Sequence, residues 1–287
     1  MKYYMVDVFA ENKYEGNQLA VFIPDRKMET TEMQKIAREM NFSETTFILS
    51  DLQDNGGYDV KIFSPDSELP FAGHPTLGTA YVIKNLLGRS ESSQIKLNLS
   101  AGQIPVVFED HYAWMTQNQP EFGADVEIER IVAILQINRE DIKTDFPIQE
   151  VSTGLPSVIV HLNSLDAVHR CKINHIAYEK LLKDIGEVNL LVFTTETASP
   201  ENDLNVRVFM CNTGYLEDPA TGSANGNLAG YLLKHNFFHS NDIGYRVEQG
   251  AFIGRPSLLK IHAKKSDDHY LIQVGGQVIT VSEGKWY

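Results

Sequence analysis

Apolar runs separated by polar turns predict many short strands and few helices along this chain. Two such runs, at residues 3–9 and 19–23, flank a turn at Gly16-Asn17 and predict a hairpin. Residues 33–40 carry apolar side chains at i, i+3, i+4 and i+7, which predicts an amphipathic helix. Thr31 and Gln34 have the spacing of a capping box at the start of that helix. Asp125 and Asn174 are the predicted caps of two later helices, and further strands are expected at 47–49, 60–63, 95–99, 104–108, 156–162, 188–193, 245–248, 257–262, 270–274 and 278–281.

One pattern occurs twice: an apolar strand, a Gly/Pro loop with acidic residues, and a mostly apolar helix. The copies span residues 58–83 and 204–233, and their strands align when position 60 is placed on position 206. After an insertion of three residues in the second copy, Gly73 aligns with Gly222. A repeat unit this long excludes solenoid arrays, which need several short units. Two similar lobes are therefore expected.

Both repeated helices are apolar on most sides, and a helix of that kind is buried on most sides. Many short strands around one buried helix predict a curled sheet that wraps it, with Gly78, Gly226 and Gly230 allowing close approach of the strands. The apolar pattern breaks at residues 117–123, which contain Asn118, Pro120 and Gly123. We expect a first lobe of residues 1–118 plus 277–287, a second lobe of residues 119–276, and an active-site cleft between them.

Composition narrows the function. The net charge of −13 argues against nucleic-acid and other polyanionic partners, which need a basic face. No apolar run is long enough to span a bilayer, and acidic and basic residues interrupt any signal-peptide pattern at the start. Two cysteines, Cys171 and Cys211, make neither a disulfide framework nor a four-thiolate metal site. These features predict a cytoplasmic protein.

The start of each repeated helix coincides with a glycine and a polar residue, Gly73-His74 in one copy and Gly222-Ser223 in the other. A helix start offers unpaired N–H groups and the positive end of the helix dipole, and glycine lets a ligand approach the backbone. Two such starts predict a site for an anionic group, most simply a carboxylate. The alternative is that both loops only turn the chain, with Ser223 as an ordinary N-cap.

Four segments, in chain order, resemble the hallmark segments of the phenazine-biosynthesis PhzF-like isomerase family: NFSETTFIL at 41–49, ELPFAGHPTLGTA at 68–80, EDPATGSANG at 217–226 and EQGAFIGRPS at 248–257. The resemblance extends over essentially the whole chain. It implies the α+β diaminopimelate-epimerase-like fold, in which each of two lobes is a β-barrel-like sheet around a central helix. It also implies no metal or organic cofactor, a small carboxylate substrate and a homodimer.

The family's functional residues match this sequence position by position. The resemblance places its acid–base glutamate at Glu44, with His74 and Asp218 assisting proton transfer and orienting the substrate. It places the binding of the substrate carboxylate at Gly73, Gly222 and Ser223. In the best-known member of that family, these groups isomerise trans-2,3-dihydro-3-hydroxyanthranilate. A glutamate suits this reaction, because one carboxylate accepts a proton from one carbon and delivers it to another. Partial burial is expected to raise the pKa of such a glutamate.

Two other functions are weighed. Racemases of this fold use two cysteines at the loop apices, but here those positions are Gly73 and Gly222. A non-catalytic binding module would have no need of a proton shuttle, although fold and motif alone do not guarantee turnover. Of the remaining charges, Lys61, Arg207 and Glu217 are expected to face solvent, and residues 254–257 are expected to form a supporting turn.

Overall fold

The computed structural model describes residues 1–211 and 216–287. Part of the three-residue insertion in the second copy therefore lies outside the described residues. The chain divides into two compact units: unit 1 is Met1–Thr116 with Gly275–Tyr287, and unit 2 is Gln117–Val274. The second junction falls inside the strand β17 (His269–Gly276).

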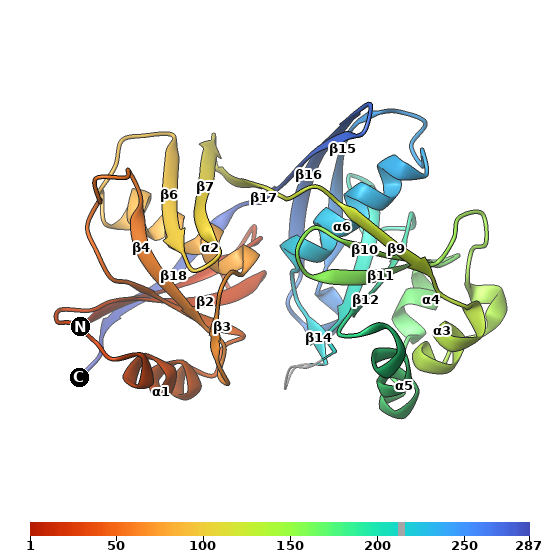
Figure 1. Cartoon of the computed structure of the whole chain (residues 1–287), viewed down its shortest axis with the longest axis horizontal. Coiled ribbons are helices and arrows are strands. Elements are labelled where there is room, and N and C mark those ends of the chain that lie inside the picture. Colours follow the sequence, from red (N-terminus) through yellow and green to blue (C-terminus); the bar gives the residue numbers. More distant parts are fainter. Residues whose placement is uncertain (212–215) are drawn as a thin grey trace. The chain divides into compact units, whose positions relative to one another are not determined.

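Unit 1 contains one mixed sheet, a central helix and a peripheral helix (Figure 1). The strands pair in the order β18–β1–β2–β3–β4–β6–β7–β8, and the two-residue strand β5 pairs with β4. The elements are β1 (Lys2–Val8), β2 (Asn17–Ile23), α1 (Thr30–Met40), β3 (Glu44–Ile48), β4 (Tyr58–Phe63), β5 (Glu68–Leu69), α2 (Gly73–Tyr81) with a π-helical turn (Val82–Leu86), β6 (Gln94–Leu99), β7 (Gly102–Glu109), β8 (Tyr112–Thr116) and β18 (Val278–Lys285).

Unit 2 repeats this arrangement with more helices on the outside of its sheet. Its strands pair in the order β9–β10–β11–β12–β13–β15–β16, and the short strand β14 pairs with β13. The elements are β9 (Glu121–Asp125), α3 (Ile128–Leu135), a 3₁₀ turn (Arg139–Asp141), β10 (Gln149–Ser152), β11 (Pro156–His161), α4 (Leu165–Arg170), α5 (His175–Ile185), β12 (Asn189–Thr194), β13 (Leu204–Phe209), β14 (Glu217–Asp218), α6 (Gly222–Lys234), β15 (Asp242–Gln249), a 3₁₀ turn (Ala251–Ile253), β16 (Ser257–Ser266) and most of β17.

The two sheets have the same topology. In unit 1 the successive pairs of β1–β2–β3–β4–β6–β7 are antiparallel, parallel, antiparallel, parallel and antiparallel. The pairs of β10–β11–β12–β13–β15–β16 in unit 2 follow the same sequence. The predicted α+β fold of two similar halves is confirmed, because the duplication is present in strand order and direction as well as in sequence.

Each unit is built around one buried helix, as predicted. Helix α2 contacts strands β1, β2, β3, β6, β7, β8 and β18, and α6 contacts β10, β11, β12 and β16. All side chains of α6 from Gly222 to Leu233 are buried except Ser223. A Cβ atom at Gly78 would lie 2.6 Å from Leu19 Cδ2, so the close approach of α2 to β2 requires glycine there.

Two predicted helix caps are wrong. The N-cap of α1 is Glu29, and the Gln34 amide donates to the carbonyls of Ser64 and Pro65 instead of closing a capping box with Thr31. Asp125 ends strand β9, and Glu127 is the N-cap of α3. In the first case the Gln34 side chain is bonded to the loop at residues 64–65, and in the second Asp125 pairs with Gln149 in the sheet. The third cap is confirmed, since Asn174 accepts a hydrogen bond from the Ala177 N–H.

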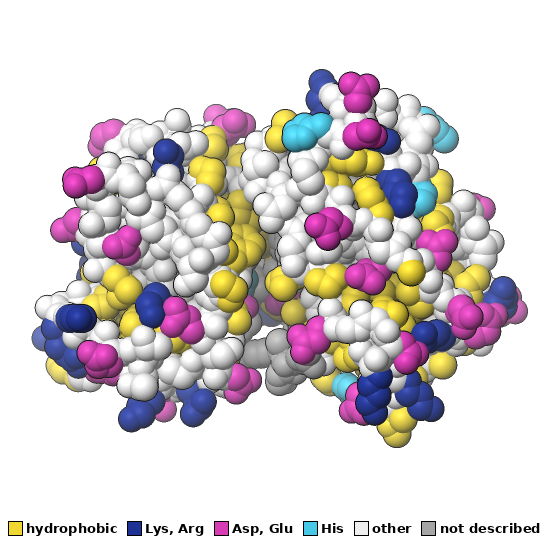
Figure 2. Space-filling view, in the orientation of Figure 1, with side chains coloured by type: hydrophobic (Ala, Val, Ile, Leu, Met, Phe, Trp, Pro, Cys, Tyr) yellow, Lys and Arg dark blue, Asp and Glu magenta, His cyan; other side chains and the backbone are white. Residues whose placement is uncertain are grey.

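The surface carries mixed charges. On the face drawn in Figure 2, acidic side chains are spread over both units and basic side chains lie among them. Within residues 1–211 and 216–287, every helix is too short or too polar to cross a bilayer.

Candidate functional site

Glu44 and His74 lie together in unit 1. Glu44 is the first residue of β3, and His74 is the second residue of α2. The Glu44 Oε2 atom lies 3.4 Å from His74 Nε2, and the two side chains are 19% and 7% exposed. The carboxylate is therefore largely withdrawn from bulk water, although residues just after a helix are usually solvated.

Burial keeps the His74 imidazole neutral. It lowers the pKa of His74 to about 3, an effect that a hydrogen bond to the backbone of Gln18 only partly opposes. Because His74 Nε2 has no hydrogen-bond partner among the described residues, the bond to Gln18 is made by Nδ1. The contact with Glu44 is thus one between a carboxyl group and a neutral ring nitrogen, a pair that can share or pass on a single proton.

A buried hydroxyl pair fixes β3 against α2. The Thr46 and Thr79 Oγ1 atoms are 2.8 Å apart, and neither residue is exposed to solvent. Glu44 lies two residues before Thr46, and His74 lies five residues before Thr79. The hydrogen bond therefore holds the two elements that carry the site in register with each other.

The predicted residues of unit 2 lie at the start of α6. Gly222 and Ser223 are its first two residues, and Asp218 ends the short strand β14. The first helical bond of α6 is donated by Asn225 N–H to the Thr221 carbonyl, so the N–H groups of Gly222 and Ser223 precede the helical ladder. Gly73 and His74 occupy the same place in α2. Each helix start offers N–H groups of the kind that bind anions.

Sequence reasoning missed two residues beside Asp218. Thr221 Oγ1 lies 2.5 Å from Asp218 Oδ2, and the Gln249 amide is hydrogen-bonded to both residues. All three are buried. A signal was present in the sequence, because the residues of the first copy that align with Asp218 and Thr221 are the apolar Leu69 and Ala72.

Arg207 and Glu217 are buried, which corrects the prediction that they face solvent. They form a bidentate ion pair with distances of 3.0 and 2.7 Å, and both side chains are 6% exposed. Helix α4 covers the outer face of β13, so a side chain on that face is enclosed instead of solvated. Arg207 Nη1 donates to the carbonyls of Val168, His169 and Cys171 at the end of α4, where a cation is favoured by the helix dipole.

The matched residue in unit 1, Lys61, is half-buried. Its Nζ atom lies 3.0 Å from Glu68 Oε2 and also donates to Thr30 Oγ1 of α1. The Lys61 and Glu68 side chains are 31% and 29% exposed. Lys61 is therefore a peripheral charge, close to what was expected.

The turn that packs against the Asp218 loop lies at residues 250–254, earlier than the expected 254–257, because Ser257 already begins β16. Gly250 and Gly254 both have positive φ angles, of 76° and 74°. A Cβ atom at Gly250 would lie 2.4 Å from the carbonyl oxygen of Pro219 and 2.3 Å from that of Arg255. Only glycine fits this close approach, which packs the turn against the residue that follows Asp218.

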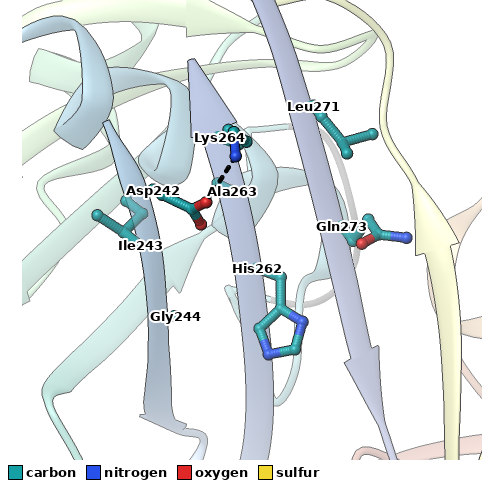
Figure 3. Close-up of a pocket in the computed structure, with 8 residues that line it drawn as sticks. All are labelled: Asp242, Ile243, Gly244, His262, Ala263, Lys264, Leu271 and Gln273. Atoms are coloured by element: carbon teal, nitrogen blue, oxygen red, sulfur yellow. Dashed lines mark hydrogen bonds and ion pairs between the residues drawn. The ribbon is translucent and has the colours of Figure 1, made fainter. Parts of the chain in front are cut away.

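Two surface cavities lie apart from the six predicted residues. One of about 360 Å³ lies on strands β15, β16 and β17 of unit 2, beside the Asp242–Lys264 ion pair and His262 (Figure 3). The other, of about 660 Å³, is lined by the loop before α1 together with Leu49 and Lys61. Neither is lined by Glu44, His74 or the start of α6, so neither adds to the candidate site.

The two cysteines lie in surroundings that disfavour the thiolate. Cys171 is buried, and burial raises the pKa of its thiol to about 12; burial also raises the pKa of the Cys211 thiol. A protonated, buried thiol is a poor base. Within residues 1–211 and 216–287, no group of three His, Cys, Asp or Glu side chains is placed to hold a metal ion.

Comparisons with known proteins agree with the segments and the duplicated fold. The family model of the phenazine biosynthesis-like proteins, PhzC-PhzF, matches residues 6–284. The chain is 33% identical over 288 residues to an uncharacterised isomerase of Pasteurella multocida, covering 99% of this chain and 93% of that one. It is also 33% identical over 293 residues to the trans-2,3-dihydro-3-hydroxyanthranilate isomerase of Pseudomonas chlororaphis, covering 98% of each. A crystal structure of a PhzF-family phenazine biosynthesis protein from Bacillus anthracis superposes with a TM-score of 0.91 at 25% identity, covering 99% and 98% of the two chains.

Proposed function

Because the chain belongs to the phenazine biosynthesis-like protein family of isomerases, we propose that it isomerises a small unsaturated carboxylic acid by moving a proton between two carbons. The proposed substrate is a cyclic acid with an acidic C–H beside a double bond, of the class named for the Pseudomonas relatives. The reaction needs neither metal nor organic cofactor, because a carboxylate alone suffices to carry the proton.

Glu44 is the proposed proton carrier. Its carboxylate takes a proton from one carbon, and the resulting carboxylic acid delivers the proton to a second carbon of the same molecule. The observation that carries this proposal is the pairing of Glu44 with a buried, neutral His74 at 3.4 Å. A neutral ring nitrogen beside the carboxyl group can take up or return a proton, which fits a carboxylate that carries a proton between two carbons.

The remaining residues bind and orient the substrate. Backbone N–H groups at Gly73 and Gly222 and the Ser223 hydroxyl are proposed to bind the carboxylate. His74 and Asp218 orient the polar substituents of the ring and assist proton transfer. The homodimer implied by the family resemblance is proposed as well, and light scattering on the purified protein tests it.

The test is proton exchange with solvent. The protein is incubated in D₂O with trans-2,3-dihydro-3-hydroxyanthranilate and related unsaturated acids, and deuterium uptake is followed by mass spectrometry. Glu44→Gln is expected to lower the exchange rate by about 10²–10⁴-fold, the range typical of a lost general base. Glu68→Gln is the matched control, since Glu68 is a half-buried glutamate of the same unit with Lys61 as its partner.

Each result points to one function. Exchange by wild type and Glu68→Gln but not by Glu44→Gln supports the isomerase. Equal exchange by Glu44→Gln removes Glu44 from the mechanism. Binding of the acids without exchange, across the whole panel, favours a non-catalytic binding module.

A further inference from the structure

The amide of Gln249 is saturated with hydrogen bonds to the Asp218 loop. Its Nε2 donates to the Asp218 carbonyl at 2.9 Å and to Thr221 Oγ1 at 3.0 Å. Its Oε1 accepts from the Thr221 N–H at 3.2 Å and from Asn225 Nδ2 at 2.9 Å. Gln249 is 1% exposed. Both donors and both acceptor positions of this buried amide are therefore used within one short segment.

The backbone fixes which way this amide points. A carbonyl oxygen only accepts, and a backbone N–H only donates. The Asp218 carbonyl must therefore face the NH₂ of Gln249, and the Thr221 N–H must face its oxygen. A flipped amide would place two acceptors together and two donors together, so the orientation follows from the contacts themselves.

The oriented amide in turn fixes the Thr221 hydroxyl. Thr221 Oγ1 accepts a hydrogen from Gln249, so its own hydrogen is directed to Asp218 Oδ2. The Asp218 carboxylate is thus held as an acceptor through a chain of two hydrogen bonds that begins at the Gln249 amide. A chain of this kind restricts the rotation of the carboxylate.

The first repeat shows that the fold does not need these polar groups. In unit 2, Asn205 pairs with Glu248, and the next pair along the strands is Val206 with Gln249. In unit 1, the pair that corresponds to Asn205 with Glu248 is Asp59 with Asn98. One residue further on, the counterpart of Gln249 is Leu99, which is buried. All three members of the chain, Asp218, Thr221 and Gln249, thus have apolar counterparts in unit 1: Leu69, Ala72 and Leu99.

We propose that Gln249 and Thr221 are positioning residues that hold the Asp218 carboxylate in the orientation the reaction requires. The consequence for turnover rests on the proposed function. The positioning itself rests only on the hydrogen bonds of unit 2 and on their replacement by apolar residues in unit 1. Reactive groups misplaced by about 1 Å commonly lose about 10²-fold in rate, so such residues matter without touching the substrate.

The experiment combines crystal structures with kinetics on four variants. Gln249→Leu installs the residue of the first repeat. Thr221→Val removes the hydroxyl with little change of shape, and Thr221→Ser keeps it. Gln149→Leu is the matched control, because Gln149 is another buried glutamine of unit 2, whose amide bonds Gly123, Asp125, Lys234 and His235.

Gln249→Leu and Thr221→Val are expected to lower kcat for trans-2,3-dihydro-3-hydroxyanthranilate roughly 10–100-fold, with KM changed less than kcat. Thr221→Ser should keep kcat within about threefold. Because the two residues act through one chain, a fifth variant, Gln249→Leu/Thr221→Val, should be no slower than Gln249→Leu alone. Crystal structures should show the Asp218 carboxylate turned away from position 221 while α6 stays in place.

The proposal fails if Gln249→Leu keeps both kcat and the position of the Asp218 carboxylate, or if Gln149→Leu lowers kcat equally. Should Gln249→Leu not fold, Thr221→Val against Thr221→Ser gives the same decision. Should wild type turn over none of the acids, the proposed function fails, and the crystal structures still decide whether Gln249 and Thr221 position Asp218.

Discussion

The β4–α2 segment of unit 1 and the β13–α6 segment of unit 2 share one backbone plan but bury different side chains. In unit 1 the charged pair, Lys61 with Glu68, is half-exposed. In unit 2 the matched pair, Arg207 with Glu217, is almost fully enclosed. The same strand, loop and helix thus form with either arrangement, so the buried polar groups of unit 2 are additions to the fold and not conditions for it.

Other hydrogen bonds occur in both units and identify what the fold does require. Thr76 Oγ1 donates to the carbonyl before α2 at 2.7 Å, and Asn225 Nδ2 donates to the carbonyl before α6 at 2.9 Å. The parallel strand pair is also bridged in both units, with Asn98 donating to Asp59 in one and Asn205 donating to Glu248 in the other. Bonds shared by the repeats are therefore those that the common fold uses in both units.

The largest expected effect is the loss of stability caused by Arg207→Leu, which breaks the buried ion pair of unit 2. Arg207→Leu leaves Glu217 buried without its partner and removes the donor to three carbonyls at the end of α4. Breaking a buried pair in this way costs about 3–5 kcal/mol of the free energy of unfolding. Urea denaturation followed by circular dichroism measures the loss.

The double variant Arg207→Leu/Glu217→Leu provides the control. It removes the unpaired charge, so it should recover part of the stability that Arg207→Leu loses. A double variant as unstable as the single one would assign the cost to the uncapped carbonyls of α4 instead of the charge.

The second prediction concerns Leu99→Gln, which gives unit 1 the amide that Gln249 supplies in unit 2. Leu99→Gln buries a polar group in unit 1, where the counterparts of Asp218 and Thr221 are the apolar Leu69 and Ala72. A buried amide without hydrogen bonds costs about 1–3 kcal/mol, again measured by urea denaturation. Leu99→Met, which keeps the volume and stays apolar, should cost less. Adding Ala72→Thr to Leu99→Gln should recover part of the loss, and no recovery would show that the two loops differ in backbone as well as in side chains.

The third prediction concerns the pH dependence contributed by His74. The pKa of His74 is about 3 in the folded protein against an ordinary value of 6.5, so between these values the unfolded chain binds a proton that the folded chain does not. Its contribution to stability is therefore complete above pH 6.5 and declines as the pH falls toward 3. His74→Gln should reduce the stability lost between pH 7.5 and pH 5.5 by about 1 kcal/mol. His239→Gln, at an exposed position, should leave that loss unchanged.

Local pattern and the alignment of the two copies were sufficient for the duplicated fold and for His74 at a helix start. The family resemblance, not the pattern, singled out Glu44 and Asp218, which lie in β3 and β14, whereas the pattern predicted a strand only from residue 47 and a turn at Asp218. The environment of Arg207 could not be predicted, since the helix that covers β13 comes from residues 165–170. Gln249 was missed for a similar reason, because its partners lie about 30 residues away and meet it only through the pairing of β13 with β15. Local sequence pattern does not show which polar side chains are buried by contacts with residues distant in the sequence.

The smallest expected effect is that of Lys61→Met. Lys61 and Glu68 are about a third exposed, so solvent screens their attraction, and removing one partner leaves a carboxylate that water can reach. Pairs of this kind contribute a few tenths of a kcal/mol to at most about 1 kcal/mol. The loss should also shrink in high salt, since screening already weakens the pair, whereas the loss from Arg207→Leu should change little. Equal losses from Lys61→Met and Arg207→Leu in urea denaturation would contradict the comparison, because burial would then make no difference to the cost of breaking a charged pair.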